Sequence, residues 1–123
     1  MTQVKKFDLE ERLVKFAVMI ITLSESLQNS MAGKYIAGQI IRSGISPALN
    51  YGEAKSAEST NDFIHKMKVA LKELRETYVS LLIIQAKPLC NNREMISRCL
   101  SEANELISIF VKSIQTATKN KEK

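Results

Sequence analysis

A row of basic side chains at helical spacing is the feature of the sequence with the clearest chemical potential. His65, Lys68, Lys72 and Arg75 recur at steps of three or four residues, which places them on one side of a helix, while the glutamates of the same segment fall toward the other side. Lys68 and Lys72 repel each other on an isolated helix by roughly a few tenths of a kcal/mol, and a bound phosphate backbone would remove that penalty. The row therefore indicates nucleic-acid contact, although such a stripe can equally be a solvated helix face.

Residues suited to catalysis or metal binding are sparse. His65 is the only histidine, so Asp62-Phe-Ile-His65 lacks the second histidine that a di-metal carboxylate bundle needs. Cys90 and Cys99 lie nine residues apart, without the spacing or the number of soft ligands of a zinc site. No phosphate-binding glycine loop is present, and no paired base is available to activate a serine or cysteine. We therefore expect no enzyme activity, no metal, no cofactor and two free thiols.

Composition places the chain among helical globular proteins. Its 123 residues suit a single domain spanning 1–123, with 45% hydrophobic and 25% charged residues but only four glycines and two prolines. No stretch reaches about eighteen uncharged apolar residues, and acidic residues occur near the start, where a secretory signal would be apolar. We expect a cytoplasmic protein that does not cross a membrane, and the net charge of +5 favours a polyanionic partner modestly.

Apolar periodicity predicts an all-α fold of four helices. They are expected to span about 8–27, 33–57, 60–86 and 92–117, with frayed termini. The first expected helix, for example, carries one apolar stripe at three- and four-residue steps, formed by Leu9, Leu13, Phe16, Ala17, Ile20, Leu23 and Leu27. Because each connection is only a few residues long, adjacent helices must run antiparallel, which predicts an up-down-up-down four-helix bundle.

Pro47 is the irregularity of the second helix. Inside a helix it removes the hydrogen bond to the carbonyl of Ser43 and crowds that carbonyl, which predicts a kink. The alternative is that a helix begins at Ser46-Pro47, where serine would cap and proline would suit the first turn. Because the apolar pattern continues through Leu49 without a polar interruption, a kinked continuous helix is favoured.

Three segments are apolar on more faces than one small bundle can bury. They are Phe16–Ile21, Ile36–Leu49 and Val79–Ile84. A surface helix of a monomer needs only one apolar stripe, whereas these segments carry two adjoining stripes or are apolar all round. The pattern therefore predicts a closed homo-oligomer.

The middle of the chain resembles a known family. The residues that carry the resemblance are Arg42, Ser46, Pro47, Asn50, Glu53, Ser59 and Phe63, followed by Ala70-Leu71-Lys72-Glu73-Leu74-Arg75-Glu76-Thr77. In order and spacing they are similar to the small bacterial four-helix bundle proteins, also called 23S rRNA intervening-sequence proteins, which are related to the accessory protein of diversity-generating retroelements. The resemblance implies a homopentamer and a link to RNA.

The polar residues of this signature also allow a purely structural interpretation. Ser46, Asn50, Glu53 and Ser59 lie at or beside the end of the second helix, where side chains can satisfy free backbone groups. Two functional hypotheses follow for the whole chain. It is either a homo-oligomer that binds structured nucleic acid, RNA above all, through the basic row, or a structural or protein-interaction scaffold whose charge maintains solubility.

Overall fold

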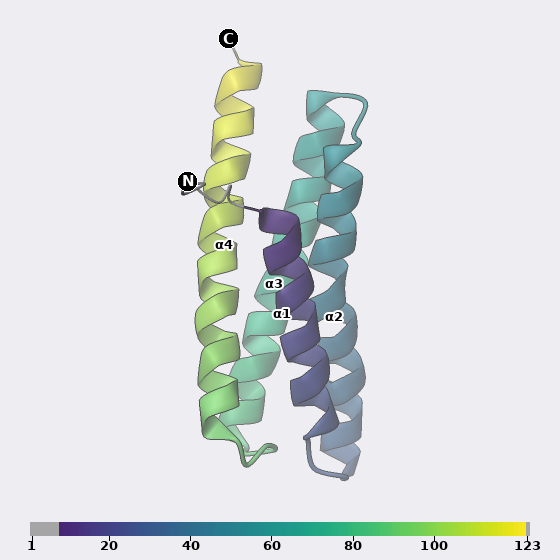
Figure 1. The fold of residues 1–123 in the computed structure, drawn as a ribbon, viewed down its shortest axis with the longest axis vertical. Coiled ribbons are helices and arrows are strands. Elements are labelled where there is room, and N and C mark those ends of the chain that lie inside the picture. Colours follow the sequence, from purple (N-terminus) through teal and green to yellow (C-terminus); the bar gives the residue numbers. More distant parts are fainter. Residues whose placement is uncertain (1–7, 123) are drawn as a thin grey trace, which may run out of the picture.

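The structure, a computed structural model, describes residues 8–122 and consists of four helices packed side by side (Figure 1). They are α1 (Leu9–Glu25), α2 (Met31–Lys55), α3 (Thr60–Ala86) and α4 (Arg93–Lys121). Figure 1 shows successive helices running in opposite directions along the bundle. Residues 8–122 contain no strand, so the prediction of an all-α four-helix bundle is confirmed.

The helices pack as a ring in which one seam is short. α2 packs against α1 and α3, and α3 packs against α4, whereas α1 meets α4 over a smaller region. α1 has 17 residues and α4 has 29, so α4 extends beyond α1 (Figure 1). Between the helices lies a continuous apolar core whose largest fully buried side chains include Phe16, Ile20, Ile40, Met67, Leu74, Leu81, Leu106 and Phe110.

Side-chain caps set where the helices begin. The carboxylate of Asp8 accepts from the amide of Glu11 at 3.0 Å, and Ser30 Oγ accepts from the amide of Gly33 at 3.0 Å. Each cap satisfies an amide that the first turn leaves without an intrahelical partner. Ser30 explains why α2 starts at Met31, two residues earlier than expected.

The end of α4 differs from the expectation. The helix was expected to finish near 117 with the remaining residues frayed, but it continues to Lys121. Lys119 and Lys121 lie in its last turn, where positive charge stabilises the partial negative charge of the helix C-terminus. The expected boundary was based on apolar burial alone and did not include this charge effect.

Pro47 lies inside α2, which runs without interruption from Met31 to Lys55. The alternative of a helix beginning at Ser46-Pro47 is therefore wrong, while the kink stays a prediction. The face of α2 that points into the bundle includes the small buried residues Ser43 and Gly44 as well as Pro47. Leu49, which belongs to the second apolar stripe, is 62% exposed.

Within residues 8–122, no helix is both long and apolar enough to cross a membrane.

Candidate nucleic-acid interface

A groove of about 690 Å³ runs between α2 and α3 on the outside of the bundle, and we call it the α2/α3 groove. Its rim carries Lys68, Lys72 and Arg75, all from α3 and all exposed. We call these three residues the basic row. Their spacing of four and three residues places them along one edge of the helix, so the row extends over about 10 Å.

The fourth residue of the expected stripe lies outside this groove. His65 is exposed on α3, one turn before Lys68, and it does not line the groove. The structure therefore brings together three of the four residues that the sequence singled out. It also adds Arg42, which α2 contributes to the same groove.

Arg42 engages the acidic residues that would otherwise neutralise the basic row. Its guanidinium donates to Glu73 at 2.8 Å and to Glu76 at 3.4 Å, and the hydrogen bond to Glu73 raises the pKa of Arg42. Among residues 8–122, Lys68 and Lys72 form no ion pair, and the same holds for Arg75. The groove therefore keeps three positive charges without internal counter-ions.

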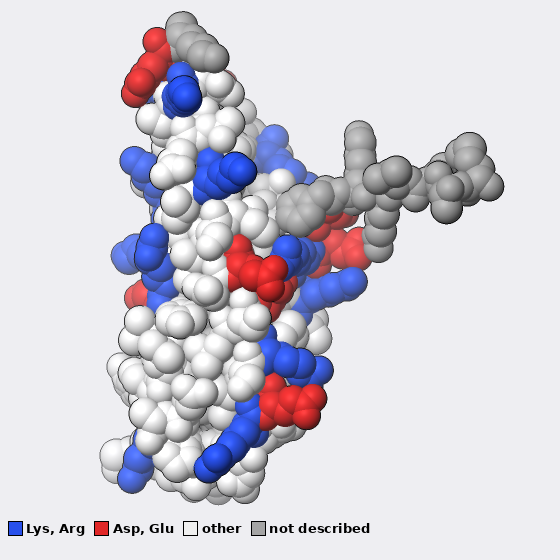
Figure 2. Space-filling model, turned by 90° about the vertical axis from the view of Figure 1, so that its left-hand side faces the viewer, with Lys and Arg blue, Asp and Glu red and all other residues white. Residues whose placement is uncertain are grey.

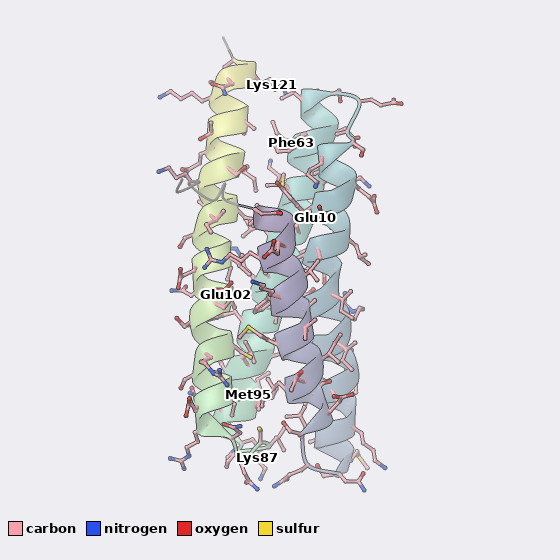
Figure 3. All side chains as sticks on the ribbon, viewed as in Figure 1. Glu10, Phe63, Lys87, Met95, Glu102 and Lys121 are labelled. Carbon is pink, nitrogen blue, oxygen red and sulfur yellow. The ribbon has the colours of Figure 1, made fainter. Side chains whose placement is uncertain are left out.

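Several other cations are occupied in holding helices together. Arg12 on α1 forms a two-nitrogen contact with Glu102 on α4 at 2.7 and 2.8 Å and also reaches Glu105 at 2.9 Å. The hydrogen bond with Glu102 raises the pKa of Arg12, and Glu102 lies at the seam between α1 and α4 (Figure 3). This cation is part of the scaffold, unlike those of the basic row.

Two lysines make comparable contacts between other pairs of helices. Lys55 on α2 donates to Glu10 on α1 at 2.7 Å, and this hydrogen bond raises the pKa of Lys55. Lys66 on α3 donates to Glu53 on α2 at 2.6 Å, with the same effect on the pKa of Lys66. Each pair joins neighbouring helices, so these cations have partners within the chain.

The face on the side of α4 lacks a comparable row. Figure 2 shows Lys and Arg side chains scattered along the length of that face, with Asp and Glu among them and a broad uncharged area between. Scattered charges do not concentrate a positive field as neighbouring ones do. This comparison selects the α2/α3 groove as the candidate interface.

The remaining signature residues have structural contacts. The amide of Asn50 donates to the carbonyl of Ser46 at 3.0 Å and to its hydroxyl at 2.9 Å, just after Pro47. Ser59 caps α3 by accepting from the amide of Asp62 at 3.0 Å. Phe63 is half-buried and packs against the core. Glu53 joins α2 to α3 through Lys66, a pairing that the separate helical patterns could not reveal.

Both cysteines of the described residues are buried, and no group of metal ligands accompanies them. Residues 8–122 contain no group of three or more His, Cys, Asp or Glu side chains placed to hold a metal ion. Cys90 and Cys99 are free and buried, and burial raises the pKa of the Cys99 thiol to about 11. A thiol with this pKa is protonated at neutral pH and is a poor nucleophile.

Two comparisons place the chain among known proteins. The model of the family described as 23S rRNA-intervening sequence protein matches residues 5–112. A solved structure of a protein of unknown function from the S23 ribosomal protein family, from Bacteroides thetaiotaomicron, is 32% identical, with a TM-score of 0.77. The alignment covers 87% of this chain and 98% of that chain. A search of curated proteins returned no match.

Proposed function

The chain belongs to the 23S rRNA-intervening sequence protein family, and from this premise we propose that it is a non-enzymatic homo-oligomer that binds structured RNA through the basic row. The single observation that carries the proposal is the absence of counter-ions for Lys68, Lys72 and Arg75 among residues 8–122. Three neighbouring cations without internal partners favour a polyanion, because binding to phosphates releases condensed counterions.

The position of the row supports contact with a large ligand. The row lies on the outer surface of α3 and borders an open groove. Lysine and arginine on such a surface contact phosphates without reading the base sequence. We therefore expect the protein to recognise the shape and backbone of a folded RNA more than its sequence.

Exposed apolar side chains support the oligomeric part of the proposal. Val18, Leu49 and Val79 are each more than half exposed, at 56, 62 and 54%, and they come from the three segments with surplus apolar character. Repetition of one basic row around an assembly would raise the effective concentration of phosphate contacts. A homopentamer is the form that the family resemblance implies, and the exposed apolar surface supports assembly without specifying five copies.

A binding experiment with matched charge changes tests the RNA proposal. The probe is a labelled RNA hairpin, titrated with protein at several salt concentrations between about 50 and 200 mM. Lys68→Gln/Lys72→Gln/Arg75→Gln should weaken binding strongly and lower the slope of log affinity against log salt by about three. The control Lys112→Gln/Lys119→Gln/Lys121→Gln removes the same charge from α4 and should lower the slope by less than about one.

The outcomes separate the two functional hypotheses. Equal losses for the two triple variants would show that the basic row is not the RNA surface. A parent protein that bound no RNA at the lowest salt would favour the scaffold hypothesis. That second candidate is favoured by one observation, namely that the α2/α3 groove also exposes Tyr35, Val79 and Ile83, which suit a protein partner.

A further inference from the structure

The outer face of α1 carries exposed apolar side chains. Val14 and Val18 are 50 and 56% exposed, and Glu11 and Glu25 are exposed before and after them on the same helix. We call these four residues the α1 outer strip. Exposed valines on consecutive turns form a narrow apolar ridge, and such a ridge on a small bundle is a contact surface when it meets a complementary groove.

The end of the α2/α3 groove beyond the basic row is apolar and can therefore receive such a ridge. Tyr35, Val79 and Ile83 line it and are 71, 54 and 50% exposed. On α3, the basic row precedes this apolar end and Lys87 follows it at the helix C-cap, at the lower end of the bundle in Figure 3. We call Tyr35, Val79 and Ile83 the apolar end of the groove.

We infer that the α1 outer strip of one copy docks into the apolar end of the α2/α3 groove of a second copy. The apolar part of the strip is followed by Glu25, and the apolar end of the groove is followed by Lys87. At the other end of the strip, Glu11 pairs with Lys15 of its own helix at 3.2 Å. From Glu11 to Glu25 the strip extends about 21 Å, and from Arg75 to Lys87 the outer edge of α3 extends about 18 Å. An apolar ridge thus meets an apolar groove, with opposite charges where Glu25 faces Lys87.

The direction of the helices agrees with this match. α1 and α3 run the same way along the bundle (Figure 1). A rotation about an axis parallel to the helices therefore lets the valines of one copy meet the apolar end of the groove of the next, with Glu25 toward Lys87. The α1 outer strip and the apolar end of the groove then face each other while both subunits keep the same orientation along the axis.

The two surfaces belong to different helices, so the contact is head-to-tail. Docking one copy leaves a free strip on one subunit and a free groove on the other, and addition continues until a ring closes. This inference rests on the self-association in the proposed function and deepens it by naming the two surfaces and their polarity. It does not depend on RNA binding.

Complementation between two variants tests the inference. Val14→Gln/Val18→Gln disables the strip, and Val79→Gln/Ile83→Gln disables the groove, with no change in net charge. Each variant should lose about 100-fold or more in self-association, because the apolar contact is gone. Light scattering should then report the 13.8 kDa mass of one chain for each. Met31→Gln, at an exposed apolar residue outside both surfaces, should keep the mass of the parent.

The decisive sample is the equimolar mixture of the two disabled variants. Each retains one intact surface, so the mixture should give a dimer of twice the chain mass and nothing larger. Formation of that dimer also shows that both variants are folded. A mixture that stays at the mass of one chain overturns the inference, as does a parent that is monomeric at micromolar concentration. These mass measurements need no RNA, so their outcome is independent of the RNA titration.

Discussion

The hydroxyl of Thr77 on α3 donates a 2.8 Å hydrogen bond to the hydroxyl of Ser43 on α2, inside the bundle. Thr77 is fully buried and Ser43 is 2% exposed, so neither group reaches water. Thr77 Oγ1 also lies 2.9 Å from the carbonyl oxygen of Glu73, and Ser43 Oγ lies 3.5 Å from that of Ile40. The pair joins α2 to α3 directly beneath the α2/α3 groove.

Removing both hydroxyls of this pair should cost less stability than the sum of removing each one alone. Thr77→Val keeps the side-chain shape but deprives Ser43 of its short partner, so the free energy of unfolding should fall by about 1–3 kcal/mol. In Ser43→Ala/Thr77→Val neither hydroxyl remains to be satisfied, and the loss should be smaller than the sum of the single losses. Urea denaturation of the parent, the two single variants and the double variant gives the coupling energy between the two hydroxyls. Strictly additive losses of unfolding free energy would contradict the prediction.

The contact between α1 and α2 should make two glycines of α2 respond in opposite ways. A Cβ at Gly44 would lie 2.7 Å from Ile20 Cγ2, whereas a Cβ at Gly38 would meet nothing within 4 Å. Gly44→Ala should therefore destabilise the bundle by about 1–3 kcal/mol through overpacking. Gly38→Ala should stabilise it by roughly 0.5–1 kcal/mol through helix propensity. Thermal unfolding monitored by circular dichroism measures both, and a stabilising Gly44→Ala would show that the helices separate easily.

Arg42 should support RNA binding beyond its own charge. In Arg42→Gln, Glu76 loses its partner and becomes available to Lys72, four residues earlier on α3. RNA affinity should then fall more than in the one-charge control Lys112→Gln. Arg42→Gln/Glu76→Gln, which restores the net charge and removes the competing carboxylate, should recover most of the loss. No difference between Arg42→Gln and the control, in the same hairpin titration, would argue against this role.

The buried thiol of Cys99 should make stability depend on alkaline pH. Its pKa in the folded protein is raised by burial to about 11, above the ordinary value of about 8.5 that it regains on unfolding. Below the unfolded value both states hold the proton and the full stability is present. As pH rises from there toward 11, only the unfolded state ionises, so stability falls. Urea midpoints of Cys99→Ala should decline less steeply than those of the parent across this range, and parallel declines would contradict the assignment.

Local periodicity was sufficient for most of α1. Leu9, Leu13, Phe16, Ile20 and Leu23 follow the helical repeat, and all are buried. A helix with a single apolar stripe has only one face that can turn toward the core. Its buried residues can therefore be predicted without knowledge of the neighbouring helices. α3 was harder, because it packs extensively against both α2 and α4, whereas α1 packs mainly against α2. On α3, the apolar side chains of Phe63, Leu71 and Tyr78 are only half-buried, whereas Glu73 and Thr77 are buried.

The sequence by itself determined the helices, because capping residues and apolar repeats act within a few residues of their own position. It also placed Lys68, Lys72 and Arg75 on one side of α3, because helix geometry alone relates them. Only the tertiary structure decided which of the basic side chains form ion pairs with acidic residues of other helices. Arg42 comes from another helix to engage Glu73 and Glu76, and a sequence pattern carries no information about which distant residue will supply such a partner. The groove between α2 and α3 has the same origin, because a surface shared by two helices exists only once they have packed.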